Sequence, residues 1–172
     1  MNRHQYRLDN PPGKRFDSDL YIECDNKAKK ELFLFLEQLG KFTNIETKEG
    51  IDEDISCILK EENRILKFEV EMKKSWKTYP FPHNFPTIDF PARRLKKNDK
   101  DIADYFIMFS FNYDFLLIVP KFLLAVSEIE SKDCSNMTND YFVKVPKDHK
   151  EIKWYKKNVG DRWIKIEKTK KI

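Results

Sequence analysis

The sequence contains little glycine and no long apolar run, and each absence excludes a class of protein. Four glycines and eight prolines in 172 residues are too few for a collagenous or low-complexity chain. The longest apolar stretches, around Phe115–Val119 and Phe122–Val126, are separated by a Pro-Lys pair and are too short to span a bilayer. No apolar segment near the amino terminus resembles a signal peptide. We therefore expect a soluble protein of the cytoplasm.

Cysteine and histidine are also scarce, and neither is spaced as a metal or catalytic motif. The three cysteines, Cys24, Cys57 and Cys134, stand alone, so we expect reduced thiols rather than a disulfide framework or a zinc site. The three histidines lack HxH or HxxxH spacing, which argues against a histidine-based nuclease. Glycine-rich nucleotide-binding motifs and serine or cysteine nucleophile motifs are absent from the sequence as well.

Large apolar side chains are abundant, with 14 Phe, 7 Tyr and 3 Trp in a sequence that is 40% hydrophobic. Such a chain can build a core although 36% of its residues are charged, because disordered chains lack this apolar mass. We expect a single domain over residues 1–172, in which residues 1–20 form an irregular arm.

The first half of the chain changes from a helical period to a strand period. Apolar residues at helical spacing predict a helix over residues 26–39, which Gly40 can end. Three segments with a period of two follow, at residues 42–47, 54–59 and 65–73. The last two are joined by a short polar link, so we expect an antiparallel hairpin. In its second strand the charged residues share one face: Lys67, Glu69, Glu71 and Lys73.

The second half is predicted to contain mainly strands. Four strands are expected, over residues 104–111, 115–119, 141–145 and 163–166. The first two form a second hairpin. Pro120 can start a helix that runs to about Ile129, and a weaker helical segment lies between the last two strands.

Positive charge is concentrated between Met72 and Asn98, where seven Lys and Arg residues accompany one acid, Asp89. From Lys77 onward this segment has no regular period, and a loop of roughly twenty residues in a compact domain is usually functional. Aromatic residues, which can stack on unpaired bases, are interleaved with the cations: Trp76, Tyr79, Phe81 and Phe85. Cations neutralise phosphates, so we expect nucleic acid to bind here through Lys74, Lys77, Arg93, Arg94, Lys96 and Lys97.

Two carboxylates and a lysine are predicted to converge at the first hairpin. Glu71 and Lys73 lie about 7 Å apart on one strand face, and Asp54 begins the partner strand. Two such carboxylates can hold Mg²⁺ or Mn²⁺ together with waters and a phosphate. The Lys73 ammonium can then position or deprotonate an attacking water. The alternative is that these charges form the solvated face of an ordinary antiparallel strand.

This arrangement resembles the core of the PD-(D/E)XK nuclease superfamily. The resemblance lies in an Asp at the start of one strand, Glu-x-Lys in the next (FEVEMKKSW), a preceding amphipathic helix and a following basic segment. It covers residues 26–77. It implies an α/β (α+β), restriction-endonuclease-like fold, in which helices flank a central mixed β-sheet. It further implies metal ligation by Asp54 and Glu71, a role for Lys73 as base or stabiliser, and Glu31 as an accessory acid.

Two departures from the motif leave alternatives open. No proline precedes Asp54, and Asp52 could take its place; Glu69 shares the face of Glu71 and could be a further metal ligand. We expect a metal-dependent endonuclease or exonuclease that hydrolyses DNA rather than RNA. The alternatives are a non-catalytic nucleic-acid-binding or assembly protein with a nuclease-like fold, and a protein–protein adaptor. Many enzymes of this kind act as dimers, which leaves a homodimer open.

Overall fold

A computed structural model describes residues 18–48, 54–81, 84–92, 103–134 and 137–167, with the backbone alone described for residues 18–24, 132–134 and 137–140. Within these ranges strands predominate over helices. The elements are α2 (Ser18–Leu39), β1 (Phe42–Thr47), β2 (Ile55–Leu59), β3 (Arg64–Lys73), β4 (Thr87–Pro91), β5 (Tyr105–Ser110), β6 (Phe115–Pro120), α3 (Lys121–Val126), β7 (Glu128–Cys134), β8 (Met137–Pro146), β9 (Lys153–Lys157) and β10 (Trp163–Ile166).

Seven strands form one mixed sheet in the order β1-β2-β3-β5-β6-β9-β10. Its neighbouring strands are antiparallel except for β3 and β5, which run parallel, with Glu71 opposite Met108 and Lys73 opposite Ser110. Between β3 and β5 the chain passes through β4, which belongs to a separate three-stranded sheet of order β4-β8-β7. The carboxyl ends of β3 and β5 therefore lie side by side.

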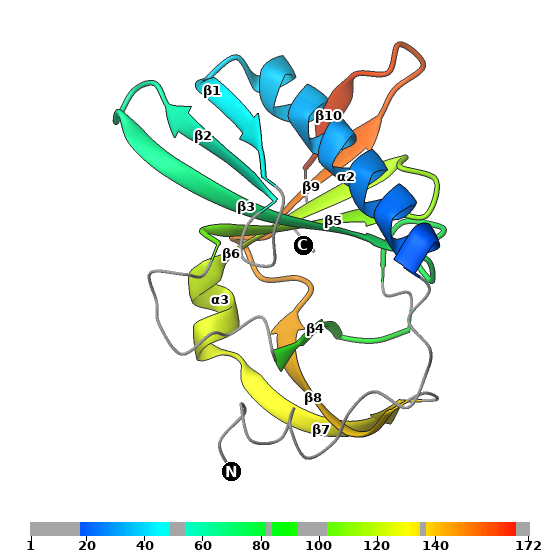
Figure 1. Cartoon of the computed structure of the whole chain (residues 1–172). Helices are drawn as coiled ribbons and strands as arrows, with labels where there is room; N and C mark the ends of the chain where they lie inside the picture. The colour runs from blue at the N-terminus through cyan, green and yellow to red at the C-terminus, as the bar shows by residue number, and fades with distance from the viewer. Residues whose placement is uncertain (1–17, 49–53, 82–83, 93–102, 135–136, 168–172) are drawn as a thin grey trace.

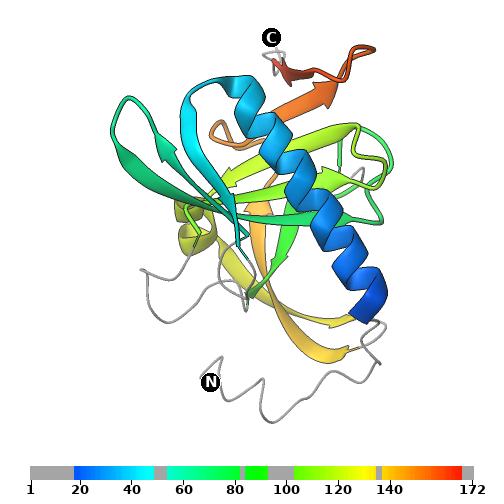
Figure 2. The same cartoon turned by 45° about the horizontal axis from the view of Figure 1, so that its top comes forward.

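Helix α2 covers one face of the seven-stranded sheet, as Figures 1 and 2 show. Its apolar stripe, which the sequence predicted, is buried against the sheet: Ala28, Leu32, Phe35 and Leu36. On the sheet side this core includes Ile55 and Cys57 of β2 and the even-numbered residues of β3 from Leu66 to Val70. The helix ends where Gly40 takes a φ of +67°, a left-handed conformation that glycine adopts without a Cβ clash.

The opposite face of the large sheet packs on the three-stranded sheet, which lies below it in Figure 1. Phe106 and Met108 of β5 meet Ile88 and Phe90 of β4 in this second core. Trp76, which follows β3, is fully buried there. Two cores on opposite faces of one sheet explain why β5 and β6 are almost continuously apolar.

The sequence-based elements agree with most of the structure but differ from it at the start of α2, which begins at Ser18 rather than at residue 26, and in three later segments. The proline-rich segment contains a strand, β4, in which Ile88 and Phe90 alternate with half-buried residues. The helix after Pro120 ends at Val126 rather than near Ile129, because the chain then enters β7 and pairs with β8. The expected helical segment before the last strand is instead β9, which lies between β6 and β10. In each of these three segments pairing with a distant strand outweighs local propensity.

The fold is thus mixed α+β with a large mixed sheet, as predicted at that level, but the described residues contain few helices. One long helix, α2, covers one sheet face, and the other face is covered mainly by strands (Figure 2). The predicted arm over residues 1–20 overlaps the start of α2 at Ser18, and residues 1–17 lie outside the described residues.

Candidate functional site

The charged face of β3 lies on the side of the sheet away from α2. Lys67, Glu69, Glu71 and Lys73 are half-buried rather than exposed, so this face differs from the solvated one considered as an alternative. Nζ of Lys73 lies 3.6 Å from Oε1 of Glu71, and the two side chains are 32% and 20% exposed. The pair lies at the carboxyl end of β3, next to the end of β5.

Asp54 directly precedes β2 and is joined to β3 by two hydrogen bonds. Its main-chain N–H donates to the carbonyl of Phe68 at 2.9 Å. Its side-chain Oδ2 accepts a bond of 2.7 Å from the N–H of Val70. The carboxylate thus bonds to the backbone of β3 one residue before Glu71, whereas the Glu71 side chain belongs to the face of β3 that points away from α2.

The second carboxylate oxygen of Asp54 contacts helix α2. Nζ of Lys29 lies 3.2 Å from Oδ1 of Asp54 and 2.8 Å from Oδ2 of Asp25. It also donates a hydrogen bond of 3.1 Å to the carbonyl of Lys48. Lys29 and Asp54 are only 9% and 8% exposed, so this ammonium–carboxylate pair is nearly removed from water.

Burial and pairing act in opposite directions on these two groups. Burial raises the pKa of the Asp54 carboxyl above its ordinary value, although the Val70 N–H and the Lys29 ammonium favour the ionised form. Burial alone would lower the pKa of Lys29, but the Asp25 and Asp54 carboxylates outweigh it and raise that pKa. Lys29 is therefore held as a buried cation.

Glu31, the accessory acid that the resemblance implies, pairs with a lysine of β9 rather than with the residues that contact Asp54. Its Oε2 lies 2.7 Å from Nζ of Lys157 at the end of β9. Two residues correspond to about 200° around a helix, so Glu31 projects from the opposite side of α2 to Lys29. The helix acid beside Asp54 is Asp25. The spacing of Asp25 and Lys29, four residues apart, was the sequence signal that could have indicated it.

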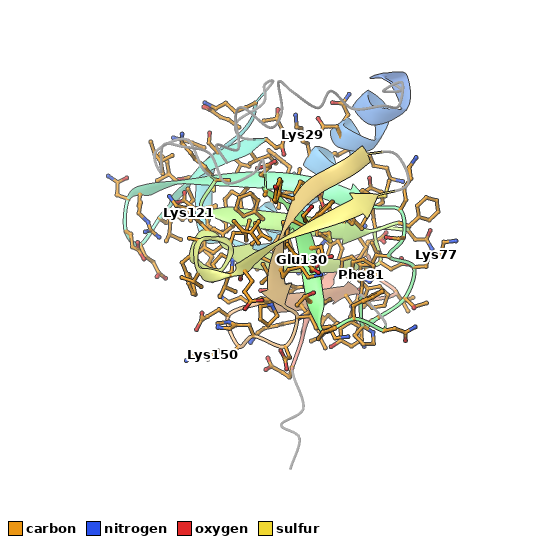
Figure 3. The ribbon with its side chains drawn as sticks, turned by 90° about the horizontal axis from the view of Figure 1, so that it is seen from below. Lys29, Lys77, Phe81, Lys121, Glu130 and Lys150 are labelled. Atoms are coloured by element: carbon orange, nitrogen blue, oxygen red, sulfur yellow. The ribbon has the colours of Figure 1, made fainter. Side chains whose placement is uncertain are left out.

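Some of the other predicted site residues lie within the described residues, and some lie outside them. Glu69 shares the face of Glu71 and lies opposite Phe106. Lys74 and Lys77 are exposed just beyond β3, and Figure 3 shows Lys77 and Phe81 on the same side of the molecule. Four predicted phosphate contacts and one alternative metal ligand lie outside the described residues: Arg93, Arg94, Lys96, Lys97 and Asp52.

The aromatic residues of the basic segment do not all remain available to bases. Trp76 is fully buried, and its indole N–H donates to the carbonyl of Thr78 at 2.9 Å. Phe81 stacks on Trp76 with ring centroids 5.4 Å apart. Tyr79 and Phe85 are 39% and 63% exposed. The Tyr79 ring already stacks on an aromatic ring of β6, with centroids 5.9 Å apart, and Trp76 belongs to the core. Stacking on a base is therefore open to Phe85.

The carboxylates of Asp54 and Glu71 have the hard oxygen donors that Mg²⁺ and Mn²⁺ prefer. Both oxygens of Asp54 are engaged, however, one by Val70 and one by Lys29. Within the described ranges no group of three or more His, Cys, Asp or Glu side chains is placed to hold a metal ion. Carboxylate oxygens are suitable ligands for a divalent cation. With Lys29 in contact with Asp54, however, the described residues do not form a complete set of metal ligands.

Comparison with known proteins found no matching family model, no matching curated protein and no matching solved structure. None of the helices in the described parts of the chain combines the length and apolar character needed to cross a lipid bilayer.

Proposed function

We propose that this protein is a metal-dependent nuclease that hydrolyses phosphodiester bonds in DNA. The observation that carries the proposal is the bond between Oδ2 of Asp54 and the N–H of Val70. It holds a carboxylate beside the strand that carries Glu71 and Lys73. The order of elements, a helix, an antiparallel three-strand meander and then a strand parallel to the third, is compatible with a restriction-endonuclease-like core.

Each residue would have a separate role in hydrolysis. Asp54 and Glu71 would hold a divalent cation, which polarises the phosphate and lowers the pKa of a bound water. Lys73 lies 3.6 Å from Glu71, so its ammonium can hold a water or offset negative charge on the phosphate. The half-buried position of both side chains strengthens their interaction, because water screens it less.

The binding surface for DNA would begin directly after the catalytic strand. Lys74 and Lys77 are exposed one and four residues beyond Lys73, where they can pair with phosphates. The exposed ring of Phe85 lies in the same basic segment and can stack on an unpaired base.

One observation favours a second function, a nucleic-acid-binding protein without catalysis. Lys29 supplies Asp54 with a positive charge from within the chain, so the carboxylate has a structural partner without a metal ion. The two functions differ in their need for a divalent cation.

Cleavage of plasmid and single-stranded DNA in Mg²⁺, Mn²⁺ or EDTA tests the proposal. We expect the wild type to cut DNA only with the metal, and Glu71→Gln and Lys73→Met to lose cleavage while they keep the wild-type circular dichroism spectrum. Glu69→Gln tests the alternative ligand. Full activity in a folded Glu71→Gln protein would remove this mechanism, and DNA binding without cleavage by the wild type would favour the non-catalytic function.

A further inference from the structure

Residues 153–167 contain the β9–β10 hairpin, which forms one end of the seven-stranded sheet (Figure 1). One face of this hairpin lies toward α2, because Tyr155 packs on Phe35 with ring centroids 4.9 Å apart. On this face Lys165 is opposite Tyr155 and pairs with Glu167 at 3.0 Å. Asp161 lines a pocket together with residues of α2. The two acids of residues 153–167 therefore lie on the α2 side of the hairpin.

The other face of the hairpin, which we call its outer face, carries Lys156, Arg162 and Ile164. Lys156 lies two residues after Trp154, which is buried in the core between the two sheets, so strand alternation places both on the face away from α2. Lys156 is opposite Ile164, and Arg162 precedes Ile164 by two residues. Both cations are exposed. Within the part of the chain that the structure describes, neither has an acidic partner.

The outer face is continuous with the end of β3, where Lys73 lies. Lys73 is opposite Ser110 at the end of β5. Oγ of Ser110 accepts a hydrogen bond of 3.0 Å from the N–H of Phe115, the first residue of β6. Phe115 is in turn opposite Lys156 of β9. Lys73 and Lys156 thus belong to one row of neighbours at the same end of the sheet, three strand spacings or about 14 Å apart.

The segment that follows β3 lies over the middle of this row. The ring of Tyr79 stacks on Phe115 with centroids 5.9 Å apart and meets Trp154 edge-on at 5.5 Å. Lys77 precedes Tyr79 by two residues and is exposed. The chain therefore holds Lys77 on the same side of the sheet as Lys156, between Lys73 and the hairpin.

We propose that the outer face of the β9–β10 hairpin is the second part of the DNA-binding surface, and that Lys156 and Arg162 contact phosphates of the DNA that Lys77 binds. The inference rests on the proposed binding of DNA. The acids of the hairpin lie on its other face and do not neutralise these cations, so a polyanion is the complementary partner. Since a DNA strand rises 3.4 Å per nucleotide, Lys156 contacts the backbone about four nucleotides from Lys73.

The salt dependence of binding to a labelled DNA duplex, measured in Ca²⁺ with the full chain, tests the inference. Lys156→Ala, Arg162→Ala should reduce the magnitude of the slope of log K against log salt by nearly two units, because each phosphate contact contributes roughly −0.9. Lys153→Ala, Lys165→Ala is the matched control. It removes two lysines from the same two strands, but on the α2 face, where Lys153 is opposite Ile118. The control should keep the wild-type slope.

A folded Lys156→Ala, Arg162→Ala protein with the wild-type slope would overturn the inference. An equal loss of slope in both double variants would also overturn it, because net charge rather than the outer face would then explain the binding. Circular dichroism checks the folding, and Lys156→Gln, Arg162→Gln replaces the alanine variant if that variant does not fold. A wild type that binds DNA without cutting it removes the proposed cleavage, whereas the slopes still decide this inference.

Discussion

Oδ2 of Asp54 accepts a hydrogen bond of 2.7 Å from the N–H of Val70, while Oδ1 of the same carboxylate lies 3.2 Å from Nζ of Lys29. One side chain therefore joins the β3 strand to the α2 helix. Asp54 is both the candidate metal ligand and a structural link, so its removal affects folding as well as chemistry.

Asp54→Ala is expected to lower the free energy of unfolding by about 3 kcal/mol, because breaking a buried ion pair leaves an uncompensated charge. Asp25 still contacts Lys29 in the variant, which limits the loss. Asp54→Asn can still accept from Val70 and should lose less stability. Urea denaturation of the three proteins measures the difference. An alanine variant as stable as the wild type would show that the pair has no structural role.

Glu31→Gln is expected to leave Mg²⁺-dependent DNA cleavage unchanged, because Glu31 pairs with Lys157 on the side of α2 away from Lys29. The variant should lose about 1–2 kcal/mol of stability, since its hydrogen bond to a largely buried ammonium is weakened. Cleavage rate and urea denaturation are the measurements, with the exposed Glu37→Gln on the same helix as control. If a folded Glu31→Gln protein no longer cleaves DNA, Glu31 is part of the active site after all.

The double change Lys74→Ala, Lys77→Ala is expected to weaken DNA binding and its dependence on salt. Each phosphate contact contributes roughly −0.9 to the slope of log K against log salt on duplex DNA, so losing two contacts should reduce its magnitude by nearly two units. Binding is measured in Ca²⁺ over a salt series. Lys150→Ala, Lys153→Ala removes two other exposed lysines, and Figure 3 shows Lys150 well apart from Lys77. If the salt dependence of DNA binding has the same slope in the Lys74, Lys77 variant and in the Lys150, Lys153 control, DNA does not bind at Lys74 and Lys77.

The buried thiol of Cys57 is expected to lower the free energy of unfolding at high pH. Burial raises the pKa of its thiol from 9.0 to about 11. The unfolded chain therefore loses this proton first, and the stabilisation present below pH 9 falls by about 1.4 kcal/mol for each pH unit between pH 9 and pH 11. Urea denaturation of the wild type and Cys57→Ala over this range isolates the thiol as a difference in slope. If the free energies of unfolding of the wild type and Cys57→Ala change with pH in parallel, burial does not raise the pKa of the Cys57 thiol.

Local patterns in the sequence determined the elements that pack through their own periodic faces. The helical spacing of Ala28, Leu32, Phe35 and Leu36 predicted α2 and its buried side, and Gly40 predicted its end. The alternation in ILKFEVEMK predicted β3 and separated its charged face from its apolar one. These features depend on neighbours a few residues apart, which the sequence lists directly.

Tertiary structure decided which charges meet across different elements. The apolar stripe of α2 fixes the rotation of the helix against the sheet, and that rotation turns Asp25 and Lys29 toward Asp54 and Glu31 toward Lys157. It also decided that Trp76 is buried and that residues 87–91 and 153–157 form strands, because their partners are far away in the sequence. Such contacts depend on the three-dimensional packing of distant segments, and no local spacing records them.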